Sequence, residues 1–173
     1  MAAPQSQPRT ASPSKQVEAF IRKFEPAVAK LARTARSAMR KRFPTAVELV
    51  YDNYNALALG FGTTERTSDV IVSVAVYASG VNLYFMYGRS LPDPKKLLQG
   101  EGNQGAFIRF ADVSVLGDPA VDALLTAATK HAKPPLPSSG RGYTVVKSIS
   151  AKQRPRRLQK SPKSSSKKPP AKG

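Results

Sequence analysis

The densest cluster of side chains that could orient a ligand is Tyr51-Asp52-Asn53-Tyr54-Asn55. Phenol, carboxylate and amide groups of this kind fix the orientation of ligands in small-molecule pockets. The same residue types also build turns, because Asn and Asp side chains bond to nearby backbone groups. We favour the turn as the simpler interpretation, since polar clusters are common at turns. Tyr51, Asp52, Asn53 and Asn55 nevertheless remain candidate ligand-binding residues.

Few residues in this sequence could support catalysis or bind a metal ion. The chain has one histidine, His131, and no cysteine, which excludes thiolate chemistry and multi-histidine metal sites within one chain. Asp112, Asp118 and Asp122 come nearest to a set of oxygen ligands, but Asp118 is expected to cap a helix. His131 is expected in the last turn of that helix, where a cation suits the dipole. We therefore predict no catalytic residues, no metal site and no cofactor.

A glycine motif occurs at Gly100–Gly105, which satisfies the pattern G-x-G-x-x-G. In a dinucleotide site this motif follows a strand and opens a helix, so that the pyrophosphate lies at the helix N-terminus. Here a helix is expected before the motif and a strand after it, and Glu101 would repel phosphate. We interpret the segment as a flexible turn.

The basic residues are the strongest indication of a partner. The chain carries 28 Lys and Arg against 11 Asp and Glu, a formal net charge of +17. Residues 132–173 hold twelve of these basic residues and no acidic one, whereas residues 43–131 hold six basic and nine acidic residues. The centre of the chain is thus not basic. A contact with a polyanion is expected at the C-terminal tail or within residues 15–42.

Residues 151–173 are rich in Lys, Arg, Ser and Pro, a composition that cannot bury a core and predicts disorder. Ser161-Pro162-Lys163 and Lys167–Lys172 resemble the tails of linker-histone-like proteins. Such a tail would bind phosphates by releasing counterions, without reading bases. A tail that only solubilises the protein is the alternative. The predicted nucleic-acid-binding residues are its nine basic side chains: Lys152, Arg154, Arg156, Arg157, Lys160, Lys163, Lys167, Lys168 and Lys172.

Two helices are predicted after a disordered arm of residues 1–13. Apolar residues recur at helical spacing from Val17 to Phe24, and Pro26 suits the first turn of a second helix that ends before Phe43-Pro44. Arg33, Arg36 and Arg40 share one face of this second helix. We interpret that face as solvated.

The longest apolar run, Val70–Tyr87, is long enough to be mistaken for a membrane span. We interpret it as a hairpin that turns at Ala78-Ser79-Gly80, because Gly80 can adopt the positive φ of a tight turn. Further strands are expected at residues 46–52, 56–61 and 106–110, and 142–150 could add a short edge strand. A short helix is expected from Asp93-Pro94 to Gly100, and a last helix from Asp118-Pro119 to before Pro134.

Several blocks resemble the bacterial YdhG-like domain, a family of unknown function: Val17–Ile21, the proline that begins the second helix, Glu48–Tyr51 and Gly105–Phe110. The resemblance spans residues 17–131 and implies an α+β fold similar to frataxin-like iron chaperones. The chain departs from the family pattern at Tyr54 or Asn55, where a proline is common, and at Asn103-Gln104, where a lysine is frequent. Arg109, within the last block, is a further candidate ligand-binding residue.

Strands in hairpin succession with helices at the ends predict an α+β fold. We expect an antiparallel sheet of about five strands with two N-terminal helices and one C-terminal helix packed on it, in a domain of residues 14–132. The predicted function is a non-enzymatic binding module whose basic tail contacts nucleic acid non-specifically. The alternative is a small-ligand or iron carrier. The N-terminus lacks the apolar core of a signal peptide, so we expect a cytoplasmic protein without a membrane partner. The basic tail would also suit a nucleoid-associated location, and the Ser-rich, acid-free start up to Glu18 leaves an organelle transit peptide as an alternative.

Overall fold

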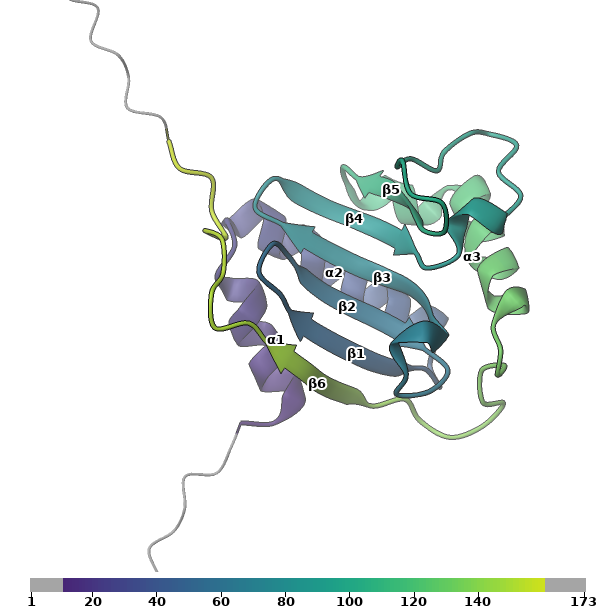
Figure 1. Ribbon diagram of the computed structural model, residues 1–173, viewed down its shortest axis with the longest axis horizontal. Coiled ribbons are helices and arrows are strands. Elements are labelled where there is room, and N and C mark those ends of the chain that lie inside the picture. Colours follow the sequence, from purple (N-terminus) through teal and green to yellow (C-terminus); the bar gives the residue numbers. More distant parts are fainter. Residues whose placement is uncertain (1–10, 161–173) are drawn as a thin grey trace, which may run out of the picture.

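A computed structural model of the protein describes residues 11–160 (Figure 1). Six strands form one sheet in the order β5-β4-β3-β2-β1-β6, and three α-helices pack on one of its faces. Figure 1 looks onto the other face, with α2 behind the strands. The predicted α+β class, with two N-terminal helices and one C-terminal helix on a sheet, is confirmed.

Each α-helix begins with a proline, where the missing N–H costs no helical hydrogen bond. The helices are α1 (Pro13–Arg22), α2 (Pro26–Arg42) and α3 (Pro119–His131). Asp118 caps α3 as predicted, because its side chain accepts a hydrogen bond from the Ala120 N–H. Short 3₁₀ turns occupy Thr67–Asp69, Gly88–Ser90 and Val113–Gly117.

Five antiparallel strands follow one another across the sheet as hairpins or longer connections. They are β1 (Val47–Asp52), β2 (Leu57–Gly62), β3 (Val70–Tyr77), β4 (Gly80–Phe85) and β5 (Ala106–Phe110). The predicted hairpin in the long apolar run is confirmed, since β3 pairs with β4 and Gly80 has a φ of +146°. No helix in the described part of the chain is long and apolar enough to cross a membrane.

The sixth strand, β6 (Thr144–Ile149), pairs with β1 in parallel and closes one edge of the sheet. The prediction of a wholly antiparallel sheet of about five strands is therefore corrected to a mixed sheet of six. The chain crosses from the end of α3 to the free edge of β1, where the Gly142 N–H donates to the Pro44 carbonyl at 2.8 Å. The edge strand that residues 142–150 could add is thus present in the sheet as β6.

The predicted helix between Asp93 and Gly100 is wrong. The Asp93 carboxylate accepts hydrogen bonds from the N–H groups of Leu97 and Leu98, and Gln99 pairs with Phe107 beside β5. These bonds satisfy the backbone groups that a helix would have used. The two leucines still pack against the core, but from an irregular loop.

Alternation along the strands divides the two faces of the sheet. Alternate residues such as Val72, Val74 and Val76 of β3 are fully buried against the helices. Their neighbours Ser73 and Tyr77 lie on the uncovered face, where they line a shallow groove. The helix-covered face therefore supplies most of the core. The other face holds a smaller buried cluster of Val47, Leu49 and Val70, and the groove beside this cluster is available to a ligand.

Candidate functional site

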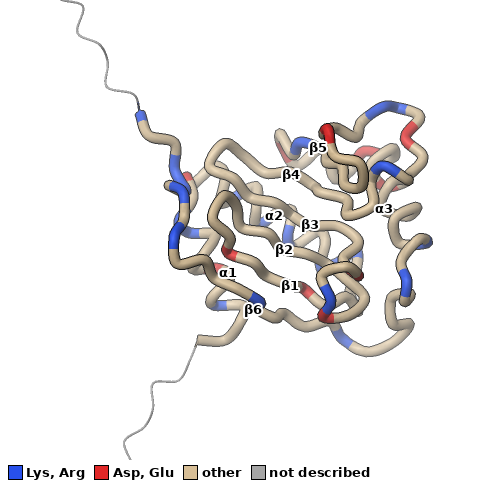
Figure 2. The backbone as a smooth tube through the Cα atoms, in the orientation of Figure 1, with Lys and Arg blue, Asp and Glu red and all other residues tan. Residues whose placement is uncertain are grey.

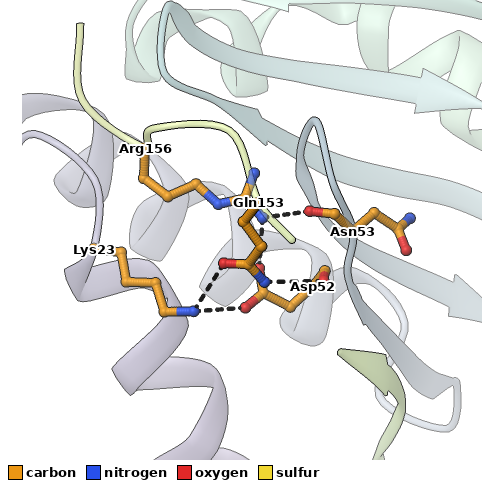
Figure 3. A network of polar contacts seen from close by, with 5 residues as sticks. All are labelled: Lys23, Asp52, Asn53, Gln153 and Arg156. Carbon is orange, nitrogen blue, oxygen red and sulfur yellow. Dashed lines mark hydrogen bonds and ion pairs between the residues drawn. The ribbon is translucent and has the colours of Figure 1, made fainter. Parts of the chain in front are cut away.

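The cluster Tyr51–Asn55 is divided between the two faces of the sheet. Tyr51 lies on the uncovered face, whereas Asp52 is fully buried on the helix-covered face. There Lys23 Nζ lies 2.8 Å from Asp52 Oδ2, and Arg156 Nη2 lies 2.8 Å from Asp52 Oδ1 (Figure 3). Asp52 therefore joins the end of α1 to the segment that follows β6 and does not belong to a ligand pocket.

Arg156 fastens residues 151–160 to the domain. It is 7% exposed, also donates to the Asn53 carbonyl, and its guanidinium lies 5.4 Å from the centroid of the Phe24 ring. Backbone bonds extend the contact, because Ser150 N–H donates to the Asp52 carbonyl and Arg154 N–H to the Tyr54 carbonyl. We name residues 151–160 the docked segment.

The predicted tail of residues 151–173 thus begins with a segment that contacts the domain. The first ten residues have a defined course because one arginine and several backbone groups find partners at the β1–β2 turn. The remaining predicted tail, with Lys163, Lys167, Lys168 and Lys172, lies outside the described residues, as do residues 1–10 of the predicted arm. Residues 11 and 12 lead directly into α1, which begins at Pro13, the last residue of the predicted arm.

Asp52 remains ionised in this buried position because cations surround it. Burial by itself would raise the pKa of Asp52, but the hydrogen bond from Lys23 and the positive charges of Lys23 and Arg156 outweigh burial. The net result is a pKa of Asp52 below its usual value. The charge of the Asp52 carboxylate is therefore compensated by Lys23 and Arg156.

The other basic side chains of the docked segment face solvent. Lys152, Arg154, Arg157 and Lys160 are exposed, and within residues 11–160 none of them forms an ion pair. Figure 2 shows blue stretches along the segment that follows β6, at the edge of the molecule that carries α1. Arg157 donates to the Lys23 carbonyl at the end of α1, which holds this backbone close to the helix. Four of the nine predicted nucleic-acid-binding residues are therefore presented together, and Arg156 is structural.

On the uncovered face, a groove of about 510 Å³ opens beside Tyr51. Tyr51, Asn53 and Asn55 all line this groove, as does Tyr54. The structure thus brings together three of the predicted ligand-binding residues. The Tyr51 hydroxyl is 2.6 Å from that of Thr67, which orients the ring against the loop that precedes β3.

Arg109 lies away from these residues. It stands on β5, three strands beyond β2, and its Nη2 donates to the Ser79 carbonyl in the β3–β4 turn at 3.1 Å. Arg109 does not line the groove. Within the described residues it contacts the hairpin turn and none of the other predicted ligand-binding residues.

The arginines of α2 are occupied by structural contacts. Arg36 forms an ion pair with the buried Glu48 at 2.6 Å, and Arg40 lies 3.7 Å from the same carboxylate. Arg33 pairs with Glu18, and Arg42 with Asp122. This helix face therefore ties α2 to α1, to the sheet and to α3.

The remaining candidate groups carry no assembled chemistry. Within residues 11–160 no three His, Asp or Glu side chains gather closely enough to hold a metal ion. Asp112 and Asp118 each accept a hydrogen bond from a backbone N–H two residues on. His131 is exposed at the end of α3, on the rim of a separate apolar cavity of about 340 Å³. The Gly100–Gly105 segment is a loop before β5.

Sequence reasoning missed the roles of Lys23 and Arg156. One signal was present: Val50 and Asp52 are two residues apart on a strand, so that both point to the same face. A carboxylate on a core-facing position requires a cation nearby. The sequence does not say which of its 28 basic residues supplies that cation, because the partners lie 29 and 104 positions away.

Comparisons of the chain with models of protein families, with curated proteins and with solved structures find no match. The YdhG-like resemblance accordingly stays a prediction.

Proposed function

We propose that this protein is a non-enzymatic binding module that contacts the phosphate backbone of nucleic acid through its basic C-terminal segment. The observation that carries the proposal is the docked segment, which presents Lys152, Arg154, Arg157 and Lys160 to solvent on a fixed support. The next four basic residues along the chain, Lys163, Lys167, Lys168 and Lys172, would extend the same contact.

Electrostatics supports this assignment. Residues 132–173 contain no acidic residue, and the nearest carboxylate, Asp52, is buried between two cations. A phosphate backbone that approaches the docked segment therefore meets uncompensated positive charge. Binding of this kind gains its free energy from the release of counterions, so it weakens as salt rises and depends little on base sequence.

The test is the affinity of the full-length protein for a fluorescently labelled DNA duplex at low salt, measured by anisotropy. A variant that carries Lys152→Gln, Arg154→Gln, Arg157→Gln and Lys160→Gln should bind at least tenfold more weakly, because four phosphate contacts are lost. These substitutions keep Arg156 and its contacts with Asp52 and Asn53, so that this clamp stays in place although Arg157→Gln removes the hydrogen bond to the Lys23 carbonyl. Deleting the tail from residue 151 would instead remove the clamp on Asp52.

The matched control removes four exposed lysines of the loop before β5 and of the end of α3: Lys95, Lys96, Lys130 and Lys133, each changed to Gln. Both variants lose the same charge, so a change in net charge alone would weaken both equally. The proposal fails if the full-length protein binds no duplex at low salt, or if the two variants bind equally.

A second candidate function, a small-ligand carrier, is favoured by the groove beside Tyr51, whose volume lies in the range of known ligand pockets. Such a carrier would gain thermal stability with its ligand. The iron carriage implied by the YdhG-like resemblance has no set of ligands within residues 11–160. Calorimetry with ferrous iron would reveal a site elsewhere in the chain.

A protein that coats nucleic acid without base preference belongs to a compartment that contains DNA or RNA. We therefore extend the proposal to a cytoplasmic, nucleoid-associated location. Fluorescence microscopy of the tagged full-length protein tests this extension.

A further inference from the structure

The floor of the groove on the uncovered face is built from unusually small residues. Tyr51, Ala58, Ala75 and Asn82 stand opposite one another on β1 to β4, and Gly60, Ser73 and Tyr84 form the next row on β2 to β4. The two central strands therefore contribute only Ala, Gly and Ser to these rows, while tyrosines stand on β1 and β4. With strands spaced about 4.8 Å apart, the strands that carry Tyr51 and Tyr84 are about 14 Å apart.

Flat aromatic rings border this floor and are accessible to solvent. Tyr54 and Tyr77 line the groove and have 48% and 37% of their surface exposed. Tyr51 and Tyr84 line it as well and are half-buried. A tyrosine that only stabilises the core would bury its ring, so four partly open rings around one trough provide faces on which planar groups can stack.

The groove carries no charged side chain from the four strands that form it. The only charged residues of β1 to β4 are Glu48 and Asp52, and both are buried on the helix-covered face. The docked segment begins at one end of the groove, where the Arg154 guanidinium lies 5.6 Å from the centroid of the Tyr54 ring. The loop with Thr67 and Asp69 borders the other end, and the Asp69 carboxylate accepts hydrogen bonds from Thr64 and Ser68.

We propose that the groove stacks the unpaired bases of a single-stranded nucleic acid whose phosphates are bound by the docked segment. The inference rests on the proposed function and names the class of nucleic acid. Charge complementarity selects this occupant, because a ligand drawn to the basic end must be anionic while the groove beside it is uncharged and aromatic. Single strands combine both properties, since each nucleotide carries one phosphate and one accessible π-face.

A duplex does not have these properties, because its base faces are stacked on each other inside the helix. A duplex would contact the cations of the docked segment and leave the groove empty. The single strand should consequently bind more tightly per phosphate, although its lower charge density weakens the purely electrostatic contribution. DNA and RNA share this chemistry, and the experiment separates them.

The test measures binding of the full-length protein, by anisotropy, to labelled oligothymidylate of about a dozen nucleotides and to an abasic oligonucleotide of equal length. The two probes carry the same phosphates and differ only in their bases. Oligouridylate provides the RNA arm. The protein variant is Tyr54→Leu with Tyr77→Leu, because both rings are exposed and Leu keeps an apolar side chain of similar reach. The matched control is Tyr143→Leu, whose ring is 52% exposed outside the groove.

Oligothymidylate should bind wild type at least tenfold more tightly than the abasic strand. The double variant should lose most of this preference while its affinity for the abasic strand is unchanged, and Tyr143→Leu should keep the preference. Equal binding of both probes by wild type, or an undiminished preference in the double variant, overturns the inference and leaves the proposed function standing. Failure of wild type to bind either probe at low salt also overturns the inference, and the duplex measurement then decides whether the proposed function fails with it.

Discussion

At the scale of single residues, the ion cluster around Asp52 holds together parts of the chain that are far apart in sequence. Lys23 follows α1, Asp52 ends β1, and Arg156 lies in the docked segment. Removing one partner of a buried ion pair is costly because the remaining charge loses its compensation. The cluster therefore makes the position of the docked segment depend on one arginine.

Arg156→Met should lower the free energy of unfolding by about 3 kcal/mol, since it leaves the buried Asp52 with only the half-exposed Lys23. Lys152→Met, at an exposed position in the same segment, should change it by less than about 0.5 kcal/mol. Urea unfolding monitored by circular dichroism measures both. Equal effects of the two substitutions would show that Arg156 is not a structural clamp.

Asp52 should also shape the response to acid. Because the folded state lowers the pKa of Asp52, its contribution to stability is complete above the range in which an unfolded carboxyl titrates, about pH 4. That contribution is lost as the pH falls through this range toward the lower pKa of the folded state. Asp52→Asn has no such proton to bind, so its free energy of unfolding should fall less steeply between about pH 5 and pH 3.

Denaturant unfolding of wild type and Asp52→Asn at several pH values in this range tests the expectation. Parallel curves for the two proteins would contradict it.

At this scale, the sequence predicts the role of a residue when its partners are close to it in the chain. Asp118 could be assigned as a cap because its partner is two residues away. The sequence suggests that Tyr51, Asn53 and Asn55 form the wall of a pocket, although a turn is the simpler interpretation. All three residues line the groove. The ion-pair partners of Asp52 could not be predicted, because only the tertiary fold brings Arg156 next to it.

At the scale of elements, the position of the docked segment depends on β6. It runs beside β1 and delivers the chain to the β1–β2 turn, where the Ser150 N–H donates to the Asp52 carbonyl. Its entry is tight, since a Cβ on Gly142 would lie 2.1 Å from the Ala46 carbonyl oxygen. Glycine at this position therefore permits β6 to reach β1.

Gly142→Ala should lower the free energy of unfolding by about 1–3 kcal/mol, because the added methyl group forces the backbones apart. Hydrogen exchange should then accelerate at the β1 and β6 amides. Gly117→Ala is the control, since a Cβ there has nothing within 4 Å. Unchanged exchange in Gly142→Ala would mean that β6 does not require this close approach.

The elements with strong local signals could be predicted from the sequence. Prolines mark the starts of all three α-helices, and the apolar run with Gly80 folds into the β3–β4 hairpin. The loop at 93–100 could not be predicted, because a capping aspartate and two leucines also suit a helix, and only the pairing of Gln99 with Phe107 decides against it. The parallel pairing of β6 likewise depends on a neighbour almost one hundred positions earlier.

At the scale of the whole molecule, charge and aromatic surface meet at the β1–β2 turn. The docked segment carries the cations to this turn, and the groove begins there with Tyr54. Composition alone showed that the C-terminal region is basic. Only the fold shows that the first part of this region is fastened beside the uncovered face of the sheet.

The dependence of duplex affinity on salt shows whether the docked segment contacts phosphates. For a phosphate-binding protein, the logarithm of the affinity falls linearly with the logarithm of the salt concentration, by about 0.9 for each phosphate contact. We expect that removing Lys152, Arg154, Arg157 and Lys160 together reduces this slope by about 3 to 4. We also expect that the control variant at Lys95, Lys96, Lys130 and Lys133 keeps the slope of wild type. A slope that is the same in all three proteins would contradict the assignment of the docked segment as the site of phosphate contact.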